Sequence, residues 1–191
     1  MCKLVVLGDS GVGKTTLINY FVNEEYNADL KATLGVDFSS KTINVNNRFI
    51  DLQIWDTAGD VRFHAVSFSF YRGANACILV YDSTSIDSFH NLSTWKDDLF
   101  AKGYIDDSEV FPILVFANKC DLTDNIQVTE NDKKQWINET SIPIIEVSAR
   151  TGFNIQKGFE QITKLYLDNE NISKSIVPIS LQLEEKKSNS C

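Results

Sequence analysis

The stretch GDSGVGKT, residues Gly8–Thr15, places glycines, a lysine and a hydroxyl residue at the spacing G-x-x-x-x-G-K-[ST]. Glycines allow the backbone to wrap closely around phosphate oxygens, and consecutive backbone N–H groups then point at the anion. Lys14 would direct its charge to the β and γ phosphates, and Thr15 would offer a hydroxyl to Mg²⁺. A glycine-rich turn without a ligand is the alternative. The motif predicts a nucleoside triphosphate site formed by Ser10, Gly11, Val12, Gly13, Lys14, Thr15 and Thr16.

Two further motifs have the chemistry to read a base. In NKCD, residues Asn118–Asp121, the Asp121 carboxylate can accept hydrogen bonds from the ring N–H and the exocyclic amine of guanine, a pair of donors that adenine lacks. Lys119 can lay its aliphatic stem on the purine, and Asn118 can tie this loop to the phosphate loop. In SAR, a backbone N–H can donate to guanine O6. A polar turn is the alternative, and the phosphate loop favours the guanine site formed by Asn118, Lys119, Asp121, Ser148, Ala149 and Arg150.

The strands that would position these motifs are short and almost entirely apolar. Such runs are typical of a parallel sheet that is covered on both faces. Ligands of such sheets bind at the carboxyl ends of the strands, and the motifs follow strand ends. The predicted buried strands are Lys3–Gly8, Ala76–Asp82, Phe111–Asn118 and Ile142–Ala149.

The rest of the chain predicts a hairpin, helices and a tail. Alternation between Val36 and Trp55, with Asn46 and Asn47 in the middle, indicates a hairpin with a tight turn. Strand–helix alternation elsewhere predicts a doubly wound sheet with right-handed crossovers. The helices expected are Lys14–Asn23, Ser85–Ala101, a short one capped by Thr129 and Asp132, and a last one ending near Asp168, with disorder expected after Asn169.

The bulk composition excludes several functional classes. The 191 residues fit one domain with a tail, and a net charge of −8 argues against broad nucleic-acid binding. The four cysteines are widely spaced, which predicts neither a zinc site nor a disulfide framework. No leader and no run of about 20 apolar residues is found, so we expect a protein of the reducing cytosol.

These motifs, in this order, resemble the Ras-like small GTPases and specifically the Rab family. The resemblance rests on GDSGVGKT, TLGVDF (Thr33–Phe38), WDTAG (Trp55–Gly59), FYRGA (Phe70–Ala74), NKCD and SAR, and it is nearest to the late-endosomal and vacuolar Rab subgroup. It implies a P-loop three-layer α/β/α fold with a six-stranded, mostly parallel sheet, one antiparallel edge strand and about five helices. It also implies a GTPase domain over residues 1–168 and a flexible tail over 169–191.

The resemblance implies roles for residues of the two switch loops. Thr33 would close over the γ-phosphate and bind Mg²⁺ beside Thr15, Asp56 would hold the metal through water, and Gly59 would donate its N–H to the γ-phosphate. Tyr26 would stack near the base. Leu30 departs from the aromatic residue usual in the subgroup. Phe38, Trp55 and Phe70 match the aromatic residues that select effectors, although their spacing also fits plain core packing.

Asp60 departs from the glutamine that usually follows DTAG in this family. A glutamine amide can both accept from the attacking water and donate to the phosphoryl group, whereas aspartate only accepts, is shorter and adds negative charge. We therefore expect slow GTP hydrolysis, with Asp60, Lys14, Thr33 and Gly59 as the catalytic set. The alternatives are compensation by water or Arg62, a nearly non-hydrolysing GTP-bound scaffold, and a P-loop kinase or ATPase, which NKCD, SAR and DTAG disfavour.

The tail and the family imply the partners. Cys191 is the last residue and offers a single lipidation site, which favours reversible membrane attachment. VPISLQL (Val177–Leu183) resembles the segment that docks Rabs on a prenylation escort protein. We expect a monomer in the cytoplasm and on the cytoplasmic face of late-endosomal or vacuolar membranes. Its expected partners are an exchange factor, a GTPase-activating protein, a GDP-dissociation inhibitor, the escort protein and membrane-traffic effectors, with GTP or GDP and Mg²⁺ as ligands.

Overall fold

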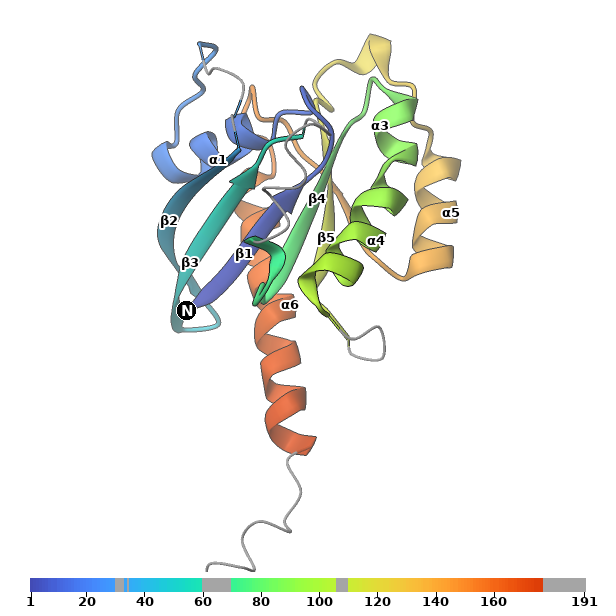
Figure 1. Ribbon diagram of the computed structural model, residues 1–191. Coiled ribbons are helices and arrows are strands. Elements are labelled where there is room, and N and C mark those ends of the chain that lie inside the picture. Colours follow the sequence, from blue (N-terminus) through green and yellow to red (C-terminus); the bar gives the residue numbers. More distant parts are fainter. Residues whose placement is uncertain (30–32, 34, 60–69, 106–109, 177–191) are drawn as a thin grey trace, which may run out of the picture.

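A six-stranded sheet organises the molecule, as the computed structural model shows (Figure 1). The structure describes residues 1–29, 33, 35–59, 70–105 and 110–176. The strand order is β2-β3-β1-β4-β5-β6, and all neighbours are parallel except β2 and β3, which makes β2 the antiparallel edge strand. The strands are β1 (Cys2–Leu7), β2 (Val36–Val45), β3 (Arg48–Thr57), β4 (Ala76–Asp82), β5 (Ile113–Asn118) and β6 (Ile144–Glu146).

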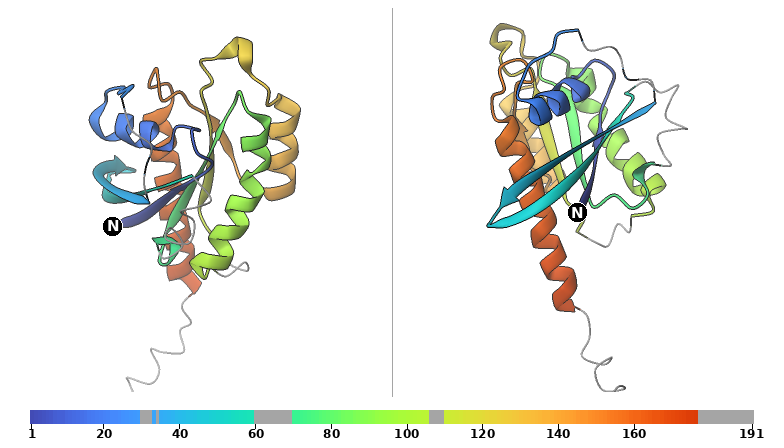
Figure 2. Two further views of the ribbon diagram at one scale, coloured as in Figure 1. Left: turned by 45° about the horizontal axis from the view of Figure 1, so that its top comes forward. Right: turned by 90° about the vertical axis from the view of Figure 1, so that its left-hand side faces the viewer.

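Helices cover both faces of this sheet, which confirms the predicted α/β/α layering (Figure 2). In the described residues they are α1 (Lys14–Asn23), α3 (Ile86–His90), α4 (Leu92–Gly103), α5 (Glu130–Thr140) and α6 (Ile155–Ile176), with a short 3₁₀ turn at Thr123–Asn125. The apolar residues of β1 alternate between the two faces because successive side chains of a strand point in opposite directions. Leu4 and Val6 pack with α1 and α6, whereas Val5 and Leu7 pack with α4 and α5.

The predicted hairpin is present with the expected turn. Val45 pairs with Arg48, which leaves Asn46 and Asn47 as a two-residue loop. Their φ angles of 52° and 61° lie in the left-handed region that Asn tolerates better than most residues. The tight turn sets the register of β2 and β3 and therefore the positions of Phe38 and Trp55, which pair across them.

The single helix predicted over Ser85–Ala101 is instead two helices that meet at Asn91. Ser85 caps α3 by accepting a hydrogen bond from the Ser88 N–H at 3.3 Å. Asn91 keeps right-handed helical backbone, but its ψ of −11° differs from the usual α-helical value by about 30°, and α4 starts at Leu92. Asparagine is a weak helix former because its side chain competes for hydrogen bonds. The apolar spacing of Phe89, Leu92 and Trp95 continues across the break and so concealed it.

The last helix is longer than predicted, since α6 runs past Asp168 to Ile176. Its extension is supported by polar contacts. The Tyr166 hydroxyl donates to Glu170 at 2.7 Å, one helical turn further on, and Glu170 pairs with Arg48 of β3 at 3.5 Å. Residues 169–176 are therefore helical rather than disordered, and residues 177–191 lie outside the described part of the chain. Among the described helices, none combines the length and apolar character needed to cross a membrane.

A capping box starts α5, as the sequence predicts. The Asp132 N–H donates to the Thr129 hydroxyl at 3.3 Å, and the Thr129 N–H donates to the Asp132 carboxylate at 2.7 Å. Each bond satisfies a backbone donor that the first helical turn would otherwise leave without a partner in the helix.

Thr129→Ala removes one half of this box and should lower the free energy of unfolding by about 1 kcal/mol. Urea denaturation at a fixed nucleotide concentration measures the change. Thr94→Ala, at an exposed position within α4, is the control and should change the free energy by less than about 0.5 kcal/mol. Equal effects of the two substitutions would contradict a capping role for Thr129.

Candidate nucleotide and magnesium site

The phosphate loop joins the end of β1 to the start of α1, in the strand-to-helix context that the motif requires. Gly13 is the N-cap of α1, with a φ of 97°, and a Cβ there would lie 2.4 Å from Asn118 Nδ2. Only glycine fits that conformation and that space. No side chain caps α1, and its first turn holds no acidic residue. The N–H groups of this helix end are therefore available to an anion.

Lys14 is buried beneath the loop, with 6% of its surface exposed. Its ammonium group donates to the carbonyl oxygens of Gly8 at 2.7 Å and Asp9 at 2.8 Å. An ammonium has three donors, so one is left for a ligand. Burial lowers the pKa of Lys14 to about 8. An anionic phosphate would offset this desolvation, because an opposite charge favours the protonated amine.

Three oxygen-bearing side chains meet beside Lys14, from three separate segments. The Thr15 hydroxyl lies 2.5 Å from Asp56 Oδ2 and 2.7 Å from the Thr33 hydroxyl, and Thr33 Oγ1 lies 3.3 Å from the same carboxylate oxygen. Asp56 is 4% exposed, and its Oδ1 has no hydrogen-bond partner within the described part of the chain. Burial raises the pKa of the Asp56 carboxyl.

This set of donors fits Mg²⁺. Hydroxyl and carboxylate oxygens are the hard ligands that the ion prefers, and its remaining positions are usually filled by water and phosphate oxygens. A buried carboxylate with an orphaned oxygen needs a compensating cation or a water held by one. The structure thus brings together the side-chain oxygens of the three residues that were expected to bind the metal, Thr15, Thr33 and Asp56.

Gly59 packs directly on the backbone of the phosphate loop. A Cβ at this position would lie 2.3 Å from the Asp9 carbonyl carbon and 2.4 Å from the Ser10 nitrogen. Any larger residue at position 59 would require the phosphate loop to move. The contact places the second switch segment beside the loop that would hold the phosphates, as the role expected for Gly59 requires.

A cavity of about 310 Å³ lies next to the phosphate loop and has a size typical of ligand sites. A larger hollow of about 890 Å³ lies among α4, α5 and α6, but none of the nucleotide motifs lines it, so size alone does not locate the site. The smaller cavity is lined by Gly11, Gly13, Thr16, Tyr26, Asn118, Lys119, Asp121, Leu122, Ala149 and Arg150.

Asn118 connects the loops around this cavity. Its side chain is 1% exposed, donates to the Val12 carbonyl at 2.7 Å and accepts from the Ala149 N–H at 3.0 Å. The expected tie between the NKCD and phosphate loops is confirmed, and the same amide also holds the SAR loop.

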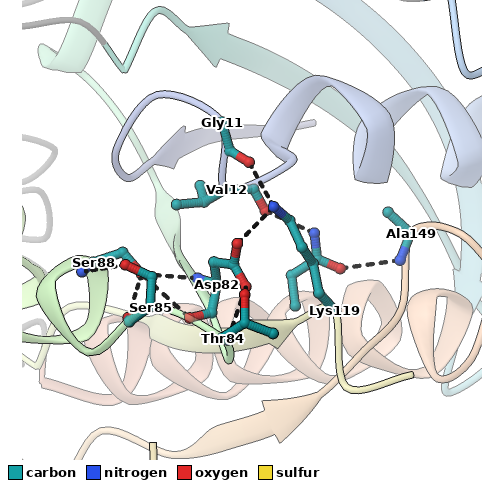
Figure 3. A network of polar contacts seen from close by, with 9 residues as sticks. Gly11, Val12, Asp82, Thr84, Ser85, Ser88, Lys119 and Ala149 are labelled. Atoms are coloured by element: carbon teal, nitrogen blue, oxygen red, sulfur yellow. Dashed lines mark hydrogen bonds and ion pairs between the residues drawn. The ribbon is translucent and has the colours of Figure 1, made fainter. Parts of the chain in front are cut away.

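Lys119 is fixed by a second set of contacts in the same network (Figure 3). Its ammonium donates to the Gly11 carbonyl at 2.9 Å and pairs with Asp82 Oδ2 at 2.6 Å. Burial alone would raise the pKa of the Asp82 carboxyl, but hydrogen bonds from Lys119 and Thr84 outweigh it and hold the pKa below its usual value. Sequence reasoning assigned no role to Asp82, and its place at the carboxyl end of β4 was the available signal.

Asp121 is oriented by Ser148. The Ser148 hydroxyl donates to Asp121 Oδ1 at 2.7 Å and accepts from the Thr151 N–H at 3.1 Å. One carboxylate oxygen is thus held by the SAR loop, while both Asp121 and Arg150 line the cavity. The geometry suits a carboxylate that reads a base edge.

Phe38, Trp55 and Phe70 form one aromatic cluster. Ring centroids are 5.2 Å apart in both the Phe38–Trp55 and the Trp55–Phe70 pair. None of the three is fully buried, and Phe38 is 47% exposed, so plain core packing does not describe them. Trp55 also packs against the core, and the Lys3 ammonium lies 4.9 Å from its ring centroid.

Asp60, Leu30 and Cys191 lie outside the described residues.

Comparison with known proteins agrees with this geometry. The Ras family model matches residues 3–168. Rab7 of Drosophila melanogaster is 44% identical over 89% of this chain and 82% of its own length. RABG3d of Arabidopsis thaliana is 40% identical over 100% of this chain and 96% of its own, and the Ypt/Rab-type GTPase ypt7 of Schizosaccharomyces pombe is 37% identical over 98% and 94%. The chain therefore belongs to the Ras family, and within it to the Rab proteins of the Rab7, RABG3 and Ypt7 group.

Proposed function

We propose that this protein is a Rab-type switch that binds GTP or GDP with Mg²⁺, hydrolyses GTP slowly, and controls traffic at late-endosomal or vacuolar membranes. One observation carries the nucleotide site. The phosphate loop, the Thr15–Thr33–Asp56 oxygens and the cavity lined by Asp121 all lie at the carboxyl ends of the strands. Family membership supports the switch function.

Each part of the surface has a separate task. The loop N–H groups and the free donor of Lys14 hold the phosphates, and Asp121 accepts from the two guanine donors. Thr15, Thr33 and Asp56 hold Mg²⁺, which supplies positive charge next to the phosphates. Because Thr33 and Gly59 come from the two switch segments, their bonds order these segments only while a γ-phosphate is present.

Slow hydrolysis is inferred from Asp60. Phosphoryl transfer is catalysed by positioning and by electrostatic stabilisation of charge on the transferring group. A carboxylate next to Gly59 adds negative charge and has no N–H to donate. An activating protein that supplies its own glutamine would restore the missing donor. A nearly non-hydrolysing GTP-bound scaffold is the second candidate, and the same residue favours it.

The interactions with partners rest on the aromatic cluster and the tail. Phe38, Trp55 and Phe70 would contact effectors, while an exchange factor, an activating protein and a GDP-dissociation inhibitor would act on the switches. An escort protein would bind the tail, and a lipid on Cys191 would attach a monomeric protein reversibly to the cytoplasmic face of its membrane.

Asp121→Asn should exchange guanine specificity for xanthine specificity, because an amide donor can face the xanthine 2-oxo group. Affinity for GDP should fall at least about tenfold while affinity for xanthosine diphosphate rises. Competition against a fluorescent nucleotide measures both. Asp124→Asn, an exposed neighbour outside the cavity, is the control and should leave GDP affinity unchanged. Equal GDP affinity in wild type and Asp121→Asn would refute the assignment.

Removal of Mg²⁺ with EDTA should speed GDP release by about tenfold or more, since the ion offsets the charge of phosphates and Asp56. Stopped-flow fluorescence measures the release rate. Thr15→Ala should release GDP quickly even with Mg²⁺ and respond little to EDTA. Thr94→Ala, at an exposed position outside the site, is the control and should keep the wild-type response. A Thr15→Ala protein with a full EDTA response would exclude Thr15 as a metal ligand.

Asp60→Gln should raise the single-turnover rate of GTP hydrolysis by at least about tenfold, because it restores the amide and removes a charge. Asp60→Leu removes the charge alone and should remain slow. GDP affinity should stay the same in both variants, which separates catalysis from binding. If Asp60→Gln hydrolyses GTP no faster than the wild type, Asp60 is not the cause of slow turnover.

A further inference from the structure

Asp9 places a carboxylate in the loop that would bind a triphosphate. It follows Gly8 directly, and its carbonyl oxygen accepts from the Lys14 ammonium at 2.8 Å. Like charges repel strongly where water is partly excluded, so a freely rotating carboxylate here would oppose phosphate binding. The structure holds this side chain in a defined direction.

Both carboxylate oxygens of Asp9 are taken by neutral donors from the α3–α4 region. Asn91 Nδ2 donates to Oδ2 at 2.8 Å, and Trp95 Nε1 donates to Oδ1 at 2.7 Å. The two donors are four residues apart, so they face the same side of the helix. Hydrogen bonds to an ionised acceptor are stronger than neutral pairs. The carboxylate is thus held towards α4, whereas Lys14 and Thr15 belong to the start of α1.

Two features of the fold place Trp95 and Asn91 where they can bond the Asp9 carboxylate. Trp95 is 4% exposed and packs in the core between the sheet and α4, so its indole N–H has a fixed direction. Asn91 is the residue at which α3 ends and α4 begins, and its backbone stays in the right-handed helical region. The residue between α3 and α4, Asn91, therefore directs its side-chain amide to the phosphate loop.

The backbone of Asp9 supports two groups that would contact phosphate. Its carbonyl oxygen accepts from the Lys14 ammonium at 2.8 Å. Its carbonyl carbon lies against Gly59, where an added Cβ would come within 2.3 Å. If the Asp9 side chain turned, its backbone would move. The carbonyl that holds the Lys14 ammonium and the surface on which Gly59 packs would move with it.

We propose that Asn91 and Trp95 are positioning residues that hold the Asp9 carboxylate away from the phosphates and fix the loop for GTP. This inference rests on the proposed function. Gly59 would contact only the γ-phosphate, whereas Lys14 would contact both the β and γ phosphates. Loss of the two donors therefore weakens GTP binding more than GDP binding. The effect depends on the Asp9 charge and not only on core packing.

The test measures dissociation constants of full-length protein for GDP and for a non-hydrolysable GTP analogue. Trp95→Phe keeps an aromatic ring but removes the N–H, and it should raise the ratio of the GTP-analogue constant to the GDP constant about tenfold. Asn91→Ala, at an exposed position, should raise the same ratio and provides the test if Trp95→Phe fails to fold. Trp136→Phe is the matched control, since its buried indole N–H has no partner within the described residues.

Replacing Asp9 by a neutral residue distinguishes an effect of the Asp9 charge from an effect of core packing around Trp95. In an Asp9→Asn background, Trp95→Phe should change the ratio by less than about twofold, because there is no carboxylate left to direct. An equal effect of Trp95→Phe in both backgrounds would overturn the proposal, as would unchanged ratios in both Trp95→Phe and Asn91→Ala. Failure of the proposed function looks different, since wild-type protein would then show no preference for guanine over adenine nucleotides.

Discussion

The site depends on one buried amide, the side chain of Asn118. It lies at the end of β5 and uses its donor on the phosphate loop and its acceptor on the SAR loop. A buried amide left without partners would cost several times what a satisfied one gains, so the three loops are stable only in this arrangement. Lys119 and Asp121 follow within three residues, where Gly11 and Asp82 fix Lys119 and Ser148 fixes Asp121.

Charge is the second constraint on this surface. Lys14 and Asp56 are both buried, and the shifts of their pKa values show that their surroundings compensate their charges incompletely. Such groups reduce the stability of a folded protein unless a ligand completes their surroundings. A magnesium–phosphate pair has the complementary charges. If Thr33 and Gly59 contact this ligand as proposed, its binding stabilises the positions of these two residues.

Much of this could be predicted from sequence because the signals are local. Continuous apolar runs identified the strands, Asn46 and Asn47 identified the turn, and the glycines and Lys14 identified the loop. The features that were not predicted depend on contacts between distant parts of the chain or coincide with a stronger sequence pattern. The break at Asn91 sits inside an uninterrupted apolar period. Beyond Asp168, α6 has few apolar residues, Ile172 and Ile176, and is supported by polar contacts. The partners of Asp82 and Asp9 are separated from them by 37 and more than 80 residues, so only the fold reveals them.

The extended last helix has a geometric consequence. Figure 1 shows α6 leaving the nucleotide end of the sheet and projecting beyond its opposite end. A helix of 22 residues spans roughly 33 Å at about 1.5 Å per residue. Its N-terminal part packs in the core through Phe159, Ile162 and Leu167, and its end at Ile176 lies at the pole opposite the candidate nucleotide site. A chain tethered by its end would hold its switches facing outward, where large proteins can approach without contacting the surface that carries it.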